Sequence, residues 1–291
     1  MLSIRKAVIP AAGFGTRHLP ITKAVPKEML PILDRPAIDY VIEECVQSGI
    51  TEICIVVSRG KEAIADYLDS RPELESALIK AEKSDKIKLI NPFKGRANFY
   101  FVRQREMRGT AKAVELCREF TADEDFAVLF PDDVIYSPGK PVIGQLIDAY
   151  RTTGASIVGV QRMPAEKARD YGVVVPSETK GRYTRIKGFI EKPAAPKLPS
   201  ELTSLGRFVL TSDIFDYIAE TPAVKGEVYL PSAIDLMSKV RNVYAYEFEG
   251  RRFDMGGVEG FLSANIAYGM MNGRLKDKIK EEVSRDDALD P

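Results

Sequence analysis

The sequence of 291 residues contains one histidine, three cysteines and no tryptophan. A Ser-His-Asp triad would have to use His18, and a zinc site built on histidines has almost no ligands to draw on. Any chemistry is therefore expected to depend on Asp, Glu, Lys and Arg side chains and on backbone amides. Such groups suit phosphoryl-type transfer, in which positioning and charge neutralisation supply most of the catalysis.

The cysteines Cys45, Cys54 and Cys117 form no Cys-x-x-Cys pair, which predicts reduced thiols that pack as small apolar residues. No apolar run is long enough for a membrane span, and the few residues before the first glycine-rich turn are too short for a signal-peptide core. These absences predict a cytoplasmic protein with no membrane partner.

The chain carries no net charge, because 42 basic residues balance 42 acidic ones. A general nucleic-acid binder would show a basic excess, so no nucleic-acid partner is expected, although a local basic pocket for phosphates is still allowed. The length is enough for one large α/β domain or two smaller ones with a substantial core.

Short apolar runs alternate with amphipathic stretches over the first 160 residues. Strands are predicted at 7–9, 53–57, 99–102, 127–130 and 156–160, and helices at 36–49, 61–69, 109–119 and 141–152. This alternation predicts an α/β fold with a Rossmann-like, doubly wound, mixed but mostly parallel sheet flanked by helices. The helix at 36–49 is expected to end near Gly49.

A charged amphipathic insertion at 70–92 interrupts this rhythm and predicts surface helices. Later strand signals at 172–175, 183–190 and 205–210, with a proline-rich loop at 192–199, predict a β-rich subdomain continuous with the first sheet. The predicted organisation is a single domain over 1–271, with halves 1–160 and 161–271, followed by a charged helix and tail over 272–291.

A glycine-rich loop, Ala11-Ala12-Gly13-Phe14-Gly15-Thr16-Arg17, follows the first predicted strand. Glycine lets the backbone turn tightly and present amide N–H groups to phosphates, and Arg17 can grip phosphate oxygens with its forked guanidinium. A Gly-x-Gly turn alone also fits an ordinary strand-to-helix connection. The loop lacks the ending of a Walker A motif and the third glycine of a dinucleotide fingerprint.

The stretch that follows, from Leu19 to Pro31, holds three prolines and the two lysines Lys23 and Lys27. It predicts a rigid loop that brings both lysines near Arg17. A solvated basic loop is the alternative, but three cations directly downstream of a phosphate-shaped turn favour a binding role.

Two acids, Asp132 and Asp133, end the predicted strand at 127–130, at the edge of an α/β sheet where ligands bind. Carboxylates there can hold Mg²⁺, although one of the two acids could instead cap a helix or support a turn. Further along, Asp254 lies in an Asp-x-Gly sequence and Glu191-Lys192 forms an adjacent pair. Taken alone, the first would be a turn and the second a surface ion pair.

Residues 11–31 resemble the signature of bacterial sugar nucleotidylyltransferases, AAGxGTRxLPxTKxxPKxMLP, at every fixed position. The ending PKEMLP is similar specifically to the UTP–glucose-1-phosphate uridylyltransferases, and the likeness extends with gaps to about residue 270. The resemblance implies a nucleotide-diphospho-sugar transferase fold, Mg²⁺ as cofactor, and a homo-oligomer of two or four copies. It implies a direct displacement in which UTP and glucose 1-phosphate give UDP-glucose and pyrophosphate.

The resemblance also implies a role for each matching residue. Gln104 would offer a donor and an acceptor to the uracil edge, Glu191 would accept hydrogen bonds from sugar hydroxyls, and Lys192 would hold the sugar phosphate. The implied residues are Arg17, Lys27 and Lys192 for catalysis; Ala11, Ala12, Gly13, Gly15, Thr16, Glu28, Gln104 and Gly109 for the nucleotide; Gly172, Glu191, Lys192 and Gly206 for the sugar; and Asp132 and Asp254 for the metal.

Two stretches depart from the family pattern. Gly109-Thr110-Ala111-Lys112-Ala113 stands where many relatives have Gly-Leu-Gly-His-Ala, and Glu227-Val228-Tyr229-Leu230-Pro231-Ser232 stands where they have Glu-Ile-Gln-Leu-Thr-Asp. The first departure concerns base or ribose recognition, and the second concerns the identity of the sugar.

Several alternatives stay open at this point. A thymidylyltransferase, or a uridylyltransferase for another sugar 1-phosphate, would carry the same loop. A non-catalytic homologue that binds a UDP-sugar would not need Lys27, Asp132 and Asp254 together. A nicotinamide-dependent dehydrogenase is disfavoured, because Ser58-Arg59-Gly60 follows the second strand where such enzymes carry an acidic ribose ligand.

Overall fold

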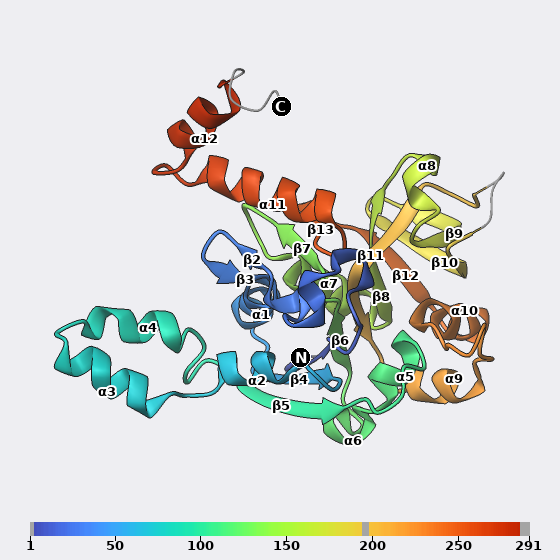
Figure 1. Cartoon of the computed structure of the whole chain (residues 1–291). Coiled ribbons are helices and arrows are strands. Elements are labelled where there is room, and N and C mark those ends of the chain that lie inside the picture. Colours follow the sequence, from blue (N-terminus) through green and yellow to red (C-terminus); the bar gives the residue numbers. More distant parts are fainter. Residues whose placement is uncertain (1–2, 194–197, 286–291) are drawn as a thin grey trace.

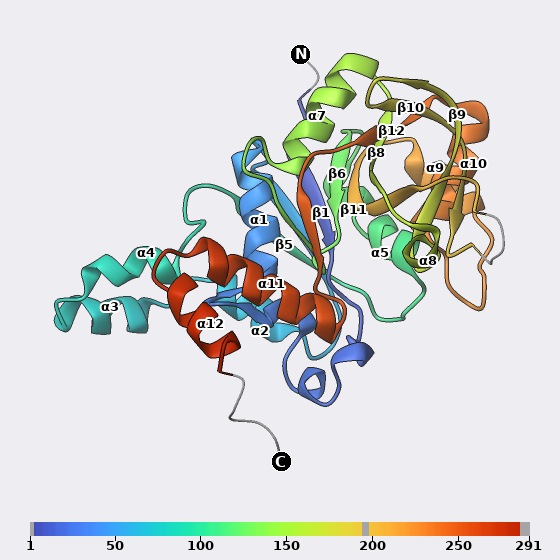
Figure 2. The same cartoon turned by 90° about the horizontal axis from the view of Figure 1, so that it is seen from above.

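The computed structural model describes residues 3–193 and 198–285. Its centre is a nine-stranded sheet with helices on both faces (Figures 1 and 2). In order across the sheet, the strands are β5 (Asn98–Arg103), β4 (Glu52–Val57), β1 (Lys6–Pro10), β6 (Phe126–Leu129), β11 (Leu202–Leu210), β8 (Ser156–Arg162), β12 (Val243–Glu247), β10 (Tyr183–Glu191) and β9 (Gly172–Lys180).

The strand directions confirm a mixed sheet that is mostly parallel. Strands β5, β4, β1 and β6 pair in parallel, and so do β8 and β12. Strand β11 is antiparallel to both β6 and β8, and β10 is antiparallel to both β12 and β9. Within this sheet, β11 and β10 therefore run against the direction that the other strands share.

Every strand predicted from the sequence matches one of these sheet strands, although the strand expected at 127–130 ends one residue earlier, at Leu129. The prediction did not include β12 or a separate two-stranded sheet of β7 (Asp133–Tyr136) and β13 (Arg251–Asp254). Strand β12 carries tyrosines at alternate positions, and β7 and β13 each carry charged side chains, so none of the three has the continuous apolar run that marks a buried strand.

The two faces of the sheet are covered by different helices. Helices α1 (Ala37–Gln47) and α7 (Val142–Thr153) bury their apolar residues in one core, while α5 (Thr110–Glu115), α9 (Ile214–Glu220) and α10 (Leu230–Val240) share the other. Helix α1 buries Ile38, Val41, Ile42 and Cys45, as its apolar spacing predicts. The chain leaves α1 through Gly49 at a φ of 85°, which confirms the expected end of the helix.

The segment from Glu62 to Asn91 confirms the predicted surface insertion. After α2 (Glu62–Leu68), helices α3 (Pro72–Lys80) and α4 (Ile87–Ile90) stand away from the body of the molecule (Figure 1), and neither buries a residue. The helix expected at 109–119 is instead divided into α5 and α6 (Arg118–Thr121), because the chain turns at Leu116 and Cys117.

The remaining elements are short except for one long helix near the end. They are β2 (Pro31–Ile32), β3 (Arg35–Pro36), α8 (Ala165–Ala168), α11 (Val258–Met271) and α12 (Lys276–Val283), with single 3-10 turns at Thr16–His18, Ile21–Lys23, Lys27–Met29 and Ser84–Lys86. The charged helix expected from residue 272 begins at Lys276. The acidic end and the centre of the proline-rich loop lie outside the described residues.

All three cysteines are buried and free, in line with their predicted packing role. The Sγ atoms of Cys54 and Cys117 lie 3.4 Å apart in the core that β4 shares with α5. Among the helices of residues 3–193 and 198–285, none is both long and apolar enough to cross a membrane.

Candidate active site

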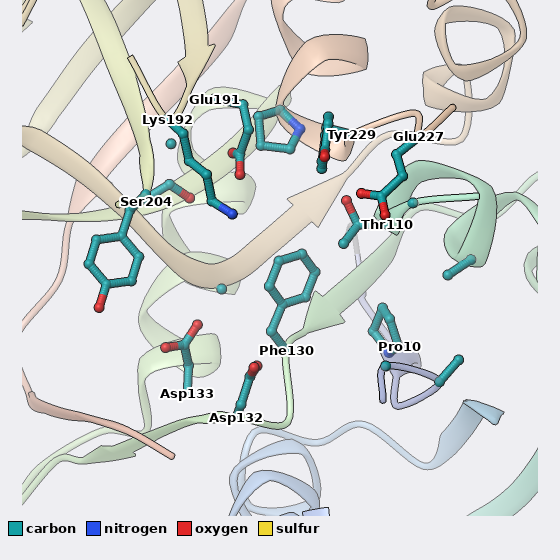
Figure 3. Close-up of a pocket in the computed structure, with 18 of the residues that line it drawn as sticks. Pro10, Thr110, Phe130, Asp132, Asp133, Glu191, Lys192, Ser204, Glu227 and Tyr229 are labelled. Carbon is teal, nitrogen blue, oxygen red and sulfur yellow. The ribbon is translucent and has the colours of Figure 1, made fainter. Parts of the chain in front are cut away.

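A cavity of about 780 Å³ opens at the carboxyl ends of β1 and β6, where α/β sheets place their ligands. Its walls come from segments that are distant in sequence. Asp132 and Asp133 lie on one side, Glu191 and Lys192 reach in from the opposite side, and a third wall carries Thr110, Glu227 and Tyr229 (Figure 3).

Most of the residues that the sequence analysis named lie around this one cavity. Those that line it are Ala12, Gly13, Gly15, Thr16, Arg17, Lys27, Gln104, Gly109, Asp132, Gly172, Glu191, Lys192, Gly206 and Asp254. Ala11 and Glu28 lie behind the cavity wall. The Ala11 amide donates to the Val56 carbonyl at 2.8 Å, and the fully buried Glu28 accepts from the Lys61 ammonium at 2.6 Å. Both support the loop from beneath.

The glycine-rich loop folds over the chain that follows it. Gly15 has a φ of 69°, and a Cβ there would lie 3.2 Å from side-chain carbons of Lys27 and Thr22. The Thr22 hydroxyl donates to the Gly15 carbonyl at 2.8 Å and fixes the turn. The extension therefore brings Lys27 beneath the loop, where the charge of Arg17 acts on it, whereas Lys23 is exposed and does not line the cavity.

Lys27 forms an ion pair with Asp132, with 2.6 Å between the ammonium and the carboxylate. Burial disfavours the charged form of Lys27, but the carboxylates of Asp132 and Glu28 outweigh it and raise the pKa of the ammonium. Burial likewise opposes ionisation of Asp132, and the charge of Lys27 outweighs it and lowers the pKa of that carboxyl. Both groups are therefore charged at neutral pH.

Asp132 and Asp254 converge on Gly256. A Cβ on Gly256 would lie 2.9 Å from Oδ1 of Asp254, 3.3 Å from Oδ2 of Asp132 and 3.0 Å from the Arg17 guanidinium. The Met255 amide donates to the Asp132 carbonyl at 2.7 Å and holds the two segments together. The absence of a side chain at Gly256 thus leaves space between two carboxylates.

This arrangement fits a hard divalent cation. Mg²⁺ is usually bound by one or two carboxylates together with substrate phosphates and water, so a protein site for it does not need three ligands. Within residues 3–193 and 198–285, no group of three or more His, Cys, Asp and Glu side chains is placed to hold a metal. Among the acids that line the cavity, Asp132 and Asp254 are the two whose carboxylates face the space at Gly256.

Asp133 has a different role from its neighbour Asp132. It forms a buried ion pair with Arg252, and burial raises the pKa of Asp133 although Arg252 acts in the opposite direction. A Cβ on Gly206 would lie 3.1 Å from the Asp133 carboxyl carbon and 2.9 Å from Phe130, so the glycine at this position makes room for the acid. The second acid thus supports the site through an ion pair, and not through the helix cap or turn that the sequence allowed.

The sugar-side residues meet where β9 and β10 pair, because Gly172 lies opposite Glu191 in the register. A Cβ on Gly172 would lie 2.6 Å from the Phe189 ring and 3.2 Å from a Glu191 carboxylate oxygen, which explains the glycine. Burial raises the pKa of Glu191, and the adjacent Lys192 offsets part of this effect. The Lys192 side chain points into the cavity (Figure 3).

Gln104, which the resemblance assigns to the base, is buried and directly follows β5. Its backbone N–H donates to the Val57 carbonyl at 2.8 Å. Gly109 has a φ of 93°, and a Cβ there would lie 2.7 Å from the backbone nitrogen of Val228. The backbone of Val228 therefore lies where a side chain at position 109 would be, and this contact requires a glycine there whether or not a base also approaches it.

The two stretches that depart from the family pattern meet in one wall of the cavity. The Thr110 hydroxyl accepts from the Leu230 amide at 3.0 Å. A hydrogen bond from Tyr229 to Glu227 raises the pKa of Tyr229 to about 12. Lys112, by contrast, pairs with Glu115 at 2.8 Å and does not line the cavity.

A Gly260→Ala substitution should disturb the metal-side carboxylate from outside the cavity. A Cβ on Gly260 would lie 2.7 Å from the Asp254 carbonyl carbon, so α11 or Asp254 must shift. We expect kcat/KM to fall about tenfold and the free energy of unfolding to fall by about 1–3 kcal/mol, the usual range for overpacking. Steady-state kinetics and urea denaturation measure the two effects.

Gly273→Ala is the matched control, because nothing lies within 4 Å of a Cβ at Gly273. Equal behaviour of the two variants would contradict the inferred contact between α11 and Asp254.

Comparisons with known proteins show to which family the chain belongs. Residues 6–270 match the family described as nucleotidyl transferase. The chain is 43% identical to the UTP–glucose-1-phosphate uridylyltransferase 2 of Staphylococcus saprophyticus, over 98% of this chain and 99% of that protein. It is 42% identical to the UTP–glucose-1-phosphate uridylyltransferase of Bacillus subtilis, over 96% of each chain.

Solved structures show the same fold. A UTP-bound UGPase from Acinetobacter baumannii superposes with a TM-score of 0.89 at 32% identity, over 98% of this chain and 100% of the other. A UDP-glucose pyrophosphorylase complexed with UDP-glucose superposes with a TM-score of 0.83 at 35% identity, over 93% of this chain and 100% of the other. From the length of the match and these identities, the chain belongs to the nucleotidyl transferase family.

Proposed function

We propose that this protein transfers the uridylyl group of UTP to α-D-glucose 1-phosphate and releases pyrophosphate, giving UDP-glucose. The observation that carries the proposal is one cavity that is lined by a phosphate-shaped loop, two acids at a strand end and the Glu191-Lys192 pair. Relatives at 42–43% identity over nearly the whole chain bear the name of this activity.

The proposed reaction is a direct displacement, in which an oxygen of the sugar phosphate attacks the α-phosphorus of UTP. The reaction forms one oxygen–phosphorus bond and breaks the bond to the pyrophosphate, which leaves with the electron pair. Two unit charges about 4 Å apart repel by about 4 kcal/mol at an effective dielectric of about 20. Cations that face the cavity offset this repulsion, and Arg17, Lys27 and Lys192 are placed to do so.

We propose Asp132 and Asp254 as the residues that hold Mg²⁺. When bound, the ion would supply positive charge to the phosphate oxygens of the nucleotide. Asp132 also keeps Lys27 charged and fixed, since the 2.6 Å ion pair joins the two side chains. Lys61 holds Glu28 beneath the same loop, so Glu28 would act on the nucleotide through the position of Lys27.

The two ends of the cavity correspond to the two substrates in this proposal. Gln104 and the glycine-rich loop would take the nucleotide from the half 1–160, and Gly172, Glu191 and Gly206 would take the sugar from the half 161–271. Glu191 is half-buried between Gly172 and Lys192, and its carboxyl oxygens would accept hydrogen bonds from sugar hydroxyls.

A substrate panel tests the proposal directly. Pyrophosphate release is measured with UTP, dTTP, ATP and GTP, each against several sugar 1-phosphates in the presence of Mg²⁺. We expect UTP with glucose 1-phosphate to give the highest kcat/KM. A preference for dTTP or for another sugar would replace the proposed substrate pair, and binding of UDP-glucose without turnover would indicate a non-catalytic homologue.

A Lys192→Ala variant should bind glucose 1-phosphate much more weakly. The loss of one hydrogen bond to a charged group costs about 1.5–3 kcal/mol, so we expect the KM for glucose 1-phosphate to rise at least about tenfold while the KM for UTP changes little. Lys187→Ala is the matched control, because Lys187 is an exposed residue of β10, the strand that ends directly before Lys192, and does not line the cavity. An unchanged KM in Lys192→Ala would remove the proposed role.

We also propose that the protein works in the cytoplasm as a homo-oligomer of two or four copies. Apolar side chains exposed on α11, at Val258, Leu262 and Ile266, support a contact between copies. Light scattering coupled to size-exclusion chromatography measures the number of copies.

A further inference from the structure

The Asp254 carboxylate is held from three directions. Its Oδ2 accepts a hydrogen bond from the Tyr171 hydroxyl at 2.6 Å and lies 3.2 Å from a terminal nitrogen of Arg252. Its Oδ1, the atom nearest to Gly256, accepts from the Gly256 amide at 2.9 Å. Tyr171 and Arg252 therefore occupy one oxygen and leave the other directed at the space between Asp254 and Asp132.

The backbone of Tyr171 contacts the opposite side of the cavity. Its carbonyl accepts a hydrogen bond from the Lys192 amide at 3.1 Å. Lys192 has a φ of 44°, in the left-handed region that non-glycine residues seldom adopt, so its direction depends on contacts such as this one. Tyr171 also directly precedes Gly172, which packs against the Glu191 carboxylate.

Arg252 fixes the orientation of the Tyr171 ring. The guanidinium lies 4.5 Å from the centre of the ring, in the arrangement of a cation–π contact. The same guanidinium pairs with the buried Asp133, which follows Asp132 in the chain. Tyr171 thus contacts the segment that carries Arg252 and Asp254 through its side chain, and the segment that carries Lys192 through its backbone. Arg252 links the first of these segments to Asp133.

We propose that Tyr171 is a positioning residue that couples the metal-side carboxylate to the sugar-phosphate lysine. Its hydroxyl fixes the position of the Asp254 carboxylate, and its carbonyl fixes the backbone of Lys192. A cation bound at Asp132 and Asp254 therefore favours the position of Lys192 that receives the sugar phosphate. By linkage, the sugar phosphate strengthens cation binding by the same factor. This inference rests on the function proposed above and adds a coupling between its divalent cation and its sugar phosphate.

The test measures binding rather than turnover. The protein is saturated with α,β-methylene-UTP, in which the bond that would break is blocked, and glucose 1-phosphate is titrated calorimetrically with Mn²⁺ and again without any divalent cation. In the wild type, we expect Mn²⁺ to tighten glucose 1-phosphate binding about tenfold or more. In Tyr171→Phe, we expect this enhancement to fall to less than twofold, because the hydrogen bond to Asp254 is lost.

Tyr40→Phe is the matched control, since it removes a tyrosine hydroxyl that donates to the Ile32 carbonyl at 3.1 Å outside the cavity. A full Mn²⁺ enhancement in Tyr171→Phe would overturn the coupling, and so would equal weakening with and without Mn²⁺. An absence of glucose 1-phosphate binding in the wild type would instead contradict the proposed function. Thermal unfolding of each variant verifies that it is folded before the titration.

Discussion

An Asp132→Asn variant should show a kcat about 10²–10³-fold below that of the wild type, comparable to the loss of one preorganised charge-stabilising group in other enzymes. Asp132 provides one of the two carboxylates beside Gly256 and is the partner of Lys27. The neutral amide is a poorer ligand for Mg²⁺. It also removes the larger of the two carboxylate charges that raise the pKa of Lys27, and leaves only Glu28 to oppose the effect of burial on that pKa.

The measurement is kcat at saturating UTP and glucose 1-phosphate over a series of Mg²⁺ concentrations. Asp66→Asn is the control, because Asp66 is exposed on α2 and lies outside the cavity. We expect the control to match the wild type. A kcat within threefold of the wild type for Asp132→Asn, at the same Mg²⁺ concentration, would remove Asp132 from both roles.

An Arg207→Met variant should lose about 3–5 kcal/mol of unfolding free energy, the range found when one partner of a buried ion pair is removed. Arg207 is fully buried and donates to both carboxylate oxygens of Glu44, at 2.8–3.1 Å. It also donates to the carbonyls of Phe130 at 3.1 Å and Asp133 at 2.6 Å. The substitution removes the guanidinium from a buried carboxylate and two carbonyls, and leaves the Glu44 charge without its ion-pair partner.

A double variant separates the cost of the unpaired charge from the loss of packing. In Arg207→Met with Glu44→Gln, the glutamine oxygen can still accept from the Ile143 amide, which Glu44 does at 2.8 Å. We expect the double variant to be more stable than Arg207→Met alone in urea denaturation, because no buried charge is left unpaired.

Arg118→Met is the control for Arg207→Met, since it breaks an exposed pair with Asp216 and should cost less than about 1 kcal/mol. Equal stability of the Arg118 and Arg207 variants would refute the buried-pair interpretation. A double variant as unstable as the sum of its two single changes would refute it as well.

The sequence predicted the main sheet well because its strands are buried on both faces. The run from Ile53 to Val56 is fully buried in β4, so its apolar residues are continuous and the pattern is unambiguous. The pair β7 and β13 escaped prediction for the opposite reason. In β13, Arg251 and Arg252 precede Phe253, and only pairing with β7 makes this charged segment a strand.

In the site, the motifs predicted which residues gather, but not how they hold one another. Lys27 and Asp132 each lie in a short local motif, so the sequence alone predicted that both belong to the site, and their side chains line one cavity. The contacts of Tyr171 with Asp254 and of Glu28 with Lys61 join residues that are far apart in the sequence. No spacing rule relates such pairs, because tertiary packing alone brings them together.

The position of β11 in the sheet has a consequence for synthesis of the protein on the ribosome. Residues Leu202–Leu210 lie between β6 and β8, both of which are translated much earlier. A nascent chain that ends at residue 162 would contain both of these strands but not the one that joins them. The edges of β6 and β8 therefore stay unpaired until residues 202–210 have been translated. An unpaired strand edge favours pairing with other chains.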